Sequence, residues 1–171
     1  MSRLYRDHVR MSQGVEWALH VLLTLSWLED DEPVTVGRLA KAHDLPAPYL
    51  NKQLQALVRA GIVESLPGAR GGFRLARPES AITMMDVVAA IEGTEQAFRC
   101  TEIRREGAGA DLDRSYFEAP CVISTAMRRA ELAWRRELAG RTIADLRAEV
   151  DDHGPDARRV TRKAFGRLPA N

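Results

Sequence analysis

The sequence has little of several features that mark common protein classes. Its 171 residues include only two cysteines, Cys100 and Cys121. In a reducing compartment such a pair is expected to be a ligand pair or redox thiols rather than a structural disulfide. The longest apolar run, Val21–Leu28, is interrupted by Thr24 and Ser26 and is far shorter than the roughly 18 apolar residues of a membrane span. We therefore expect a cytoplasmic protein.

Net charge is also nearly absent, at +1, so overall charge favours no class of partner. The distribution of charge is more informative, because residues 38–77 contain seven basic side chains and only two acidic ones, Asp44 and Glu64. A basic segment of this kind is typical of a surface that binds a polyanion. Apolar residues make up 45% of the chain, enough for a globular core.

Helical periodicity and turn residues predict the first half of the fold. Ser12 and Thr35 are expected N-caps of helices that run to about Leu28 and over Val36–His43. A third helix, Pro48–Ala60, is expected to end at Gly61. Two short β-segments follow, Ile62–Leu66 and Gly72–Ala76, around a glycine-rich turn. This order predicts a mainly α protein, a winged helix-turn-helix with a small β-hairpin wing.

The second half is less regular. Thr83 is expected to cap a fourth helix that ends at Gly93, and a long helix is expected from Cys121 to Ala139. We divide the chain into an N-terminal arm (1–10), the winged helix-turn-helix (11–93), a cysteine-containing loop (94–120), the long helix with the following segment (121–150), and a basic tail expected to be disordered (151–171).

The predicted third helix suggests how DNA is read. Leu50, Leu54 and Leu57 are expected to face the core, which leaves the polar positions between them to face the major groove. These candidate base-reading residues are Tyr49, Asn51, Lys52 and Gln55. Candidate phosphate contacts lie around the second helix and on the wing, at Thr35, Arg38, Arg70 and Arg74.

A second constellation flanks this module. Glu16 and His20 are four residues apart and lie on one face of the predicted first helix. With Cys100 and Cys121 they make four ligands, the number that either a [2Fe–2S] cluster or a tetrahedral zinc requires. A metal set that flanks a DNA reader suggests a sensor that regulates transcription. We do not expect an enzyme, because no nucleophile elbow, phosphate loop or third orienting residue accompanies Cys121 and His20.

Several motifs together resemble the IscR/NsrR family of bacterial winged-helix repressors, which sense iron–sulfur status, nitric oxide or redox state. The resemblance covers roughly residues 10–140 and rests on four segments: Tyr49-Leu50 with Leu54 and Leu57, Ala60–Val63, Gly71–Phe73 with Leu75–Arg77, and Ile82–Gly93. Most cluster-binding members have three cysteines in a short loop, whereas this chain has two, 21 positions apart. Many relatives also carry arginine before the first wing glycine, where this chain has Pro67.

The segment Val15–His20 is similar to the redox-responsive RsrR branch of this family. That resemblance implies a homodimer, with the long helix as its dimerisation element. It also implies a [2Fe–2S] cluster with Glu16 and His20 of one subunit opposite Cys100 and Cys121 of the other. Trp17, beside Glu16, is a possible switch residue, although an aromatic beside a leucine-rich stripe is more often part of the core.

The sequence is therefore interpreted as a dimeric repressor that binds a pseudo-palindromic operator under the control of a [2Fe–2S] cluster. The alternative is a winged-helix regulator of the same family that is switched by thiols or zinc, or that has no cluster.

Overall fold

The computed structural model describes residues 11–28, 32–68 and 70–166. They form two compact units: unit 1 contains the chain up to Gly93 and from Ala139 onward, and unit 2 is Thr94–Leu138. The described residues are mainly helical with one two-stranded antiparallel sheet, which confirms the predicted fold class. The expected arm, 1–10, lies outside the described residues, as do 167–171. Within the described ranges, no helix is long and apolar enough to cross a membrane.

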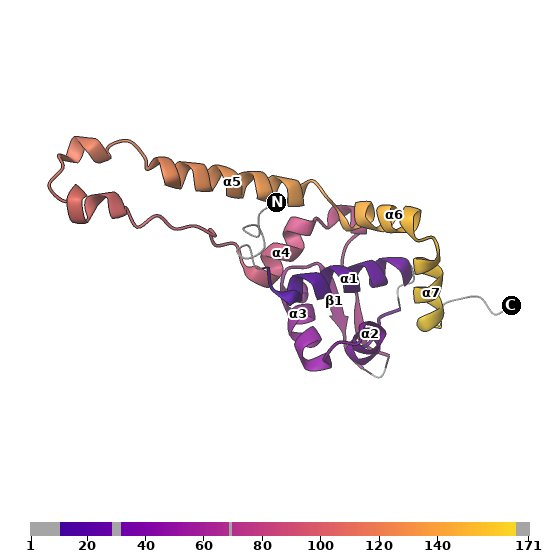
Figure 1. The fold of residues 1–171 in the computed structure, drawn as a ribbon. Helices are drawn as coiled ribbons and strands as arrows, with labels where there is room; N and C mark the ends of the chain where they lie inside the picture. The colour runs from indigo at the N-terminus through magenta and orange to yellow at the C-terminus, as the bar shows by residue number, and fades with distance from the viewer. Residues whose placement is uncertain (1–10, 29–31, 69, 167–171) are drawn as a thin grey trace. The chain divides into compact units, whose positions relative to one another are not determined.

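Unit 1 follows the order of a winged helix-turn-helix and adds two C-terminal helices (Figure 1). Its elements are α1 (Gln13–Leu28), α2 (Val36–His43), α3 (Ala47–Arg59), β1 (Val63–Leu66), β2 (Gly72–Leu75), η2 (Glu79–Ala81), α4 (Met84–Glu92), α6 (Ile143–His153) and α7 (Asp156–Ala164). The first helix ends at Leu28 as predicted, and the second has the predicted bounds. The predicted bounds of the third helix and of the two strands differ from the observed ones by one residue.

Helix α1 is the centre of unit 1. The sequence predicts a single apolar stripe along it, but every residue from Val21 to Leu28 is buried, including Thr24 and Ser26. Contacts of α1 with α3, α4, α6 and α7 account for the difference, since four helices around one leave its second half no solvent face. Ser26 Oγ donates to the Leu23 carbonyl, 2.8 Å away, which satisfies its buried hydroxyl.

Two capping boxes start α4 and α6 beside each other. Thr83 accepts from the backbone N–H of Asp86, whose carboxylate accepts from the Thr83 N–H. Thr142 and Asp145 form the same reciprocal pair at the start of α6. The two caps lie in an antiparallel bridge, in which Ile143 N–H donates to the Ile82 carbonyl, 2.9 Å away. This bridge joins the C-terminal helices to the winged helix.

The wing is attached to the turn before α2. β1 and β2 pair from Val63↔Leu75 to Leu66↔Gly72, and Phe73 exchanges two backbone hydrogen bonds with Val34, of 2.8 and 2.9 Å. A Cβ on Gly72 would lie 2.4 Å from the Val34 carbonyl carbon, so the approach of the two backbones requires glycine there.

The predicted disordered tail is wrong for the described part of residues 151–171. α6 continues to His153, and α7 packs against α1 and α6. Phe165 is only 4% exposed and belongs to the core, against which Leu146, Val150 and Ala157 also pack. Apolar residues are few in this segment, but Phe165 is buried and Ala157 is partly buried, so a small number of contacts orders a mostly basic sequence.

Unit 2 is built differently. It contains three short 3-10 turns, η3 (Ile103–Arg105), η4 (Gly107–Gly109) and η5 (Arg114–Phe117), followed by α5 (Val122–Ala139), whose last residue belongs to unit 1. Of its described residues, only Cys121 and Ser124 are buried. The unit therefore has no apolar core of its own.

Candidate functional site

The expected base-reading face of α3 is exposed. Tyr49, Asn51, Lys52 and Gln55 all face solvent, and Tyr49 is 64% exposed. On the opposite side Leu50, Leu54 and Leu57 are fully buried. The left-handed backbone of Asp44 ends α2, and Pro46 and Pro48 start α3. The turn thus directs the polar side of α3 outward.

The candidate phosphate contacts differ in how they are engaged. Thr35 caps α2 by accepting from the Arg38 N–H. The Arg38 guanidinium donates to the Phe165 carbonyl at 2.7 Å and lies over the Phe165 ring, 5.2 Å from its centroid. Arg74 forms a 2.6 Å ion pair with Glu64 across the hairpin, and Arg70 is exposed at the wing tip. Arg38 and Arg74 therefore have protein partners, which the sequence did not predict.

The two cysteines meet in unit 2 beside a carboxylate. Ligand atoms of Cys100, Glu102 and Cys121 all lie within 4.8 Å of one another. Cys100 Sγ donates to Glu102 Oε1 at 3.3 Å, and Arg104 donates to Glu102 Oε2 at 2.7 Å and to the Ala119 carbonyl at 3.3 Å. We call these three ligand residues with Arg104 the thiol centre.

The electrostatics of the thiol centre favour anionic forms. The backbone N–H of Ser124, in the first turn of α5, lowers the pKa of the Cys121 thiol, and the Ile123 N–H, the Cys100 thiol and Arg104 add to this. The hydrogen bond from Arg104, followed by that from Cys100, lowers the pKa of Glu102. Arg104 Nε is buried and has no acceptor among the described residues, so one donor is left for an anionic group.

The other half of the predicted ligand set lies in unit 1. Glu16 and His20 are both exposed on α1 and line a shallow hollow of about 430 Å³ with Met11, Val15 and Leu19. The His20 ring lies 6.2 Å from that of His43, which accepts from or donates to Thr24 Oγ1 at 3.0 Å. Trp17 is partly buried. Each half of the set is thus assembled within its own unit.

Sequence reasoning did not select Glu102 or Arg104. The charged run from Glu102 to Glu106 has the composition of a solvated loop, and only its position two residues after Cys100 indicated otherwise. Nor did it select Phe165, whose contact with Arg38 spans 127 positions.

Comparisons with known proteins agree with this architecture. Residues 11–149 match the family model of Rrf2, described as iron-dependent transcriptional regulators. A putative HTH-type transcriptional regulator of Bacillus subtilis, YwgB, is 36% identical over 149 residues, which cover 84% of this chain and 90% of YwgB. The HTH-type transcriptional regulator IscR of Cereibacter sphaeroides is 35% identical over 88 residues, covering 52% of this chain and 53% of that protein.

Among solved structures, that of T. potens IscR superposes with a TM-score of 0.64 at 20% identity, covering 86% of this chain and 92% of that one. Its likeness supports the fold. Together with the match over residues 11–149, the exposed polar face of α3 and the wing identify the class of protein. The chain belongs to the Rrf2 family of winged-helix transcriptional regulators.

Proposed function

We propose that this protein is a dimeric transcription repressor that responds to redox state through a [2Fe–2S] cluster bound by Glu16, His20, Cys100 and Cys121. The single observation that carries the proposal is the meeting of Cys100 and Cys121, which are 21 positions apart, beside a buried unpaired donor. A cytoplasmic location belongs to the same proposal.

The residues present fit such a group. Thiolates are the usual ligands of iron–sulfur clusters, and the lowered pKa of Cys121 favours its thiolate. Bound there, a [2Fe–2S] cluster would supply a one-electron redox couple. Glu16 and His20 would contribute a carboxylate and an imidazole from exposed positions one turn apart on α1.

The dimer is supported by the surface of α5. Apolar side chains along this helix are exposed: Val122 by 80%, Ile123 by 66%, Met127 by 43% and Leu132 by 48%. A monomer that leaves these side chains in water loses their burial free energy, so a second copy of α5 is the expected cover. Regulators of this family bind DNA and act as dimers.

On the DNA side, we assign base reading to Asn51, Lys52 and Gln55 on α3, with Tyr49 beside them, since their side chains face outward. Asn and Gln suit adenine edges, and Lys suits guanine or phosphate. Thr35 and Arg70 are assigned to phosphates. Arg38 and Arg74 keep protein partners and would position α2 and the wing.

Helix α1 provides a route from ligand to DNA. Gly14, two residues before Glu16, lies so close to α3 that an added Cβ would be 2.8 Å from the Gln53 amide. A shift of the start of α1 would therefore move the Gln53 side chain of α3. Trp17, the residue after Glu16, is the proposed switch residue. The coupling acts only if the two redox states differ in their affinity for DNA.

The test is the visible spectrum of anaerobically purified protein before and after dithionite, with iron and sulfide assays. We expect a coloured protein that bleaches on reduction. Glu16→Ala, His20→Ala, Cys100→Ala and Cys121→Ala should each lose iron, and Glu102→Gln is the matched control that should keep it. A wild-type protein without iron and sulfide after cluster reconstitution contradicts the proposal.

A second candidate function is favoured by Glu102. Cys100, Cys121 and Glu102 offer three zinc ligands within one unit, to which water adds a fourth. Alternatively, hydrogen peroxide takes two electrons and two protons from the thiol pair, leaving a disulfide and two waters. A colourless protein that binds zinc only while Glu102 is present, or that loses two free thiols to peroxide, supports this thiol switch instead.

A further inference from the structure

Helix α7 lies beyond the part of the chain that the family model matches. The match ends at residue 149, and α7 begins at Asp156. It packs against α1, and Arg162 donates to the Trp27 carbonyl at 3.3 Å. Trp27 in turn donates its indole N–H to Asp151 at 3.0 Å. The helix is therefore a fixed part of unit 1.

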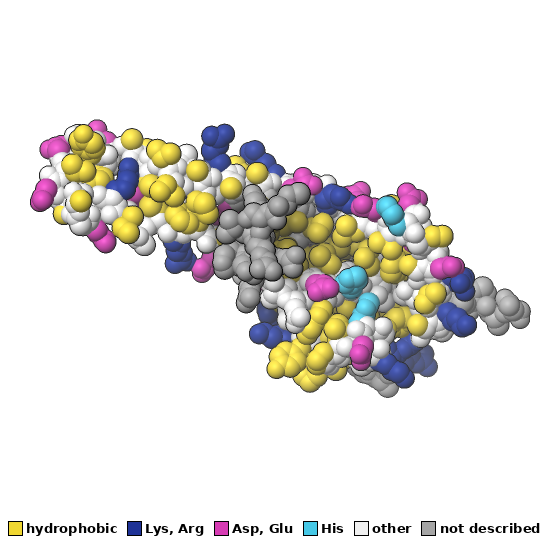
Figure 2. All heavy atoms as spheres, viewed as in Figure 1, with side chains coloured by type: hydrophobic (Ala, Val, Ile, Leu, Met, Phe, Trp, Pro, Cys, Tyr) yellow, Lys and Arg dark blue, Asp and Glu magenta, His cyan; other side chains and the backbone are white. Residues whose placement is uncertain are grey.

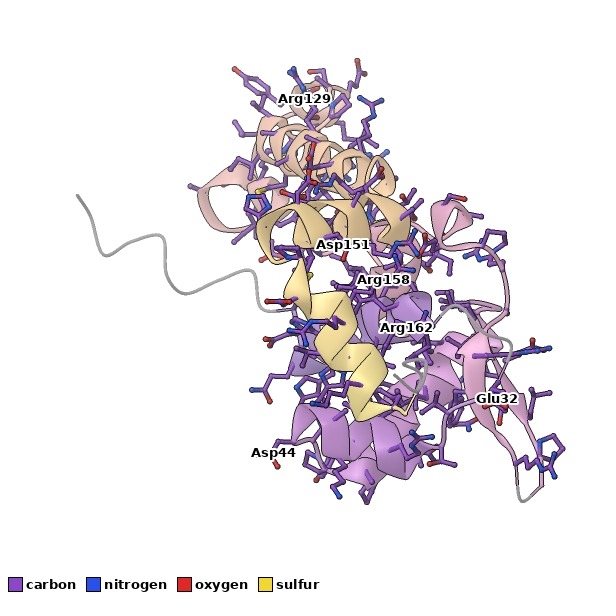
Figure 3. The ribbon with its side chains drawn as sticks, turned by 90° about the vertical axis from the view of Figure 1, so that its right-hand side faces the viewer. Glu32, Asp44, Arg129, Asp151, Arg158 and Arg162 are labelled. Carbon is purple, nitrogen blue, oxygen red and sulfur yellow. The ribbon has the colours of Figure 1, made fainter. Side chains whose placement is uncertain are left out.

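The two sides of α7 differ in their role. Ala157 and Phe165 pack into the core. Figure 3 shows that Arg158 and Arg162 leave the helix on the same side as each other. Arg159 and Lys163, one turn apart, are exposed on the remaining side. Asp156 forms an ion pair with Arg159, and the three residues Asp156, Arg159 and Lys163 together still carry a net positive charge. On the face seen in Figure 2, Lys and Arg side chains gather over α7 and next to α2.

The end of α7 lies against the start of α2. Phe165 follows its last residue, and the Phe165 carbonyl accepts from Arg38, the third residue of α2. In a helix-turn-helix, the helix before the recognition helix crosses the DNA backbone. Lys163 lies two residues from this contact, so the exposed basic side of α7 continues the surface that begins at Thr35.

We infer that α7 is an added DNA contact: Arg159 and Lys163 bind the sugar–phosphate backbone that flanks the half-site read by α3. The inference rests on the DNA-binding part of the proposed function and not on the cluster. Such contacts are independent of sequence, since phosphates carry no base information. They release counterions, so they steepen the dependence of affinity on salt.

The experiment measures the dissociation constant against salt for a duplex of arbitrary sequence, about four helical turns long. The variant is Arg159→Gln/Lys163→Gln, which spares the inward side of α7. Its matched control is Arg128→Gln/Arg136→Gln on α5, which removes the same charge from exposed positions in unit 2. Lys52→Ala on α3 reports on the helix-turn-helix itself, and thermal melts check the fold of each variant.

We expect the slope of log K against log salt to become shallower by about 2 to 4 in the α7 variant, since a dimer loses four charges at about 0.9 each. The control should keep the wild-type slope. Equal changes in both double variants, or none in either, overturn the inference. If the wild-type protein does not bind DNA, the DNA-binding part of the proposed function fails as well. None of the other outcomes contradicts that part.

Discussion

The two units of this chain use their apolar residues in opposite ways. Unit 1 encloses them: Leu22, Leu39 and Leu54 are completely buried, and even the last described helix contributes Phe165. Unit 2 exposes them, and among its described residues only Cys121 and Ser124 are buried. The DNA reader therefore has an apolar core of its own, whereas the thiol centre belongs to a unit whose apolar side chains are exposed.

The division also separates the two tasks. Every predicted DNA contact lies in unit 1, and both thiols lie in unit 2. The proposed ligand set takes two ligands from unit 1 and two from unit 2. A cluster bound by all four would therefore link unit 1, which has an apolar core, to unit 2, which has none.

The largest expected effect is in the core of unit 1. Leu22→Ala should lower the free energy of unfolding by about 3 kcal/mol, because it leaves a cavity in the core. Leu112→Ala in unit 2, where the leucine is 46% exposed, should cost less than about 0.5 kcal/mol. Urea denaturation measures both. Similar losses at the two sites would remove the distinction between the units.

The attachment of α7 comes next. Phe165→Ala should cost about 2 kcal/mol, less than a fully enclosed phenylalanine, because α7 can detach from α1 locally. Amide hydrogen exchange should show the protection of residues 156–164 falling more than that of α3. Val160→Ala, at a position 56% exposed, is the control. Equal protection in the two variants would mean that Phe165 does not anchor the helix.

A substitution on the apolar surface of unit 2 should weaken dimerisation rather than lower the free energy of unfolding. Ile123→Asp places a charge on the apolar surface of α5 and should raise the dimer dissociation constant at least about tenfold. Sedimentation velocity over a concentration series measures this. Val160→Asp makes the same kind of change on an exposed aliphatic residue of unit 1 and should leave association unchanged. An unaffected Ile123→Asp dimer would place the interface elsewhere.

The smallest effect concerns the cap that joins α6 to α4. Hydrogen bonds from the Thr142 N–H and hydroxyl lower the pKa of Asp145. A depressed carboxyl pKa stabilises the fold above the unfolded pKa of about 3.9, and this contribution is lost as the pH falls through the folded pKa. Asp145→Asn should therefore lower Tm near pH 7, and the difference should close below about pH 4. In a Thr142→Ala background the pH dependence should weaken.

Sequence reasoning predicted unit 1 well where local rules decide the structure. Thr35 and Thr83 cap helices as expected, and the leucines of α3 face inward. It failed where contacts between residues far apart in the sequence determine the structure. α7 is ordered by contacts with α1 and α2, more than 120 positions away. The meeting of Cys100 with Glu102 and Cys121 depends on how a loop of little periodicity folds, which spacing alone does not encode.

The central claim is that one metal set is completed by two subunits, and a mixing experiment tests it most directly. Glu16→Ala/His20→Ala protein is unfolded and refolded together with Cys100→Ala/Cys121→Ala protein, reconstituted anaerobically, and assayed for iron and sulfide. Neither double variant should hold a cluster alone. Random pairing makes half of the dimers mixed, each with one complete set, so the mixture should recover about a quarter of the wild-type content. A mixture as empty as its parents, beside a loaded wild type, would contradict ligand sharing between subunits.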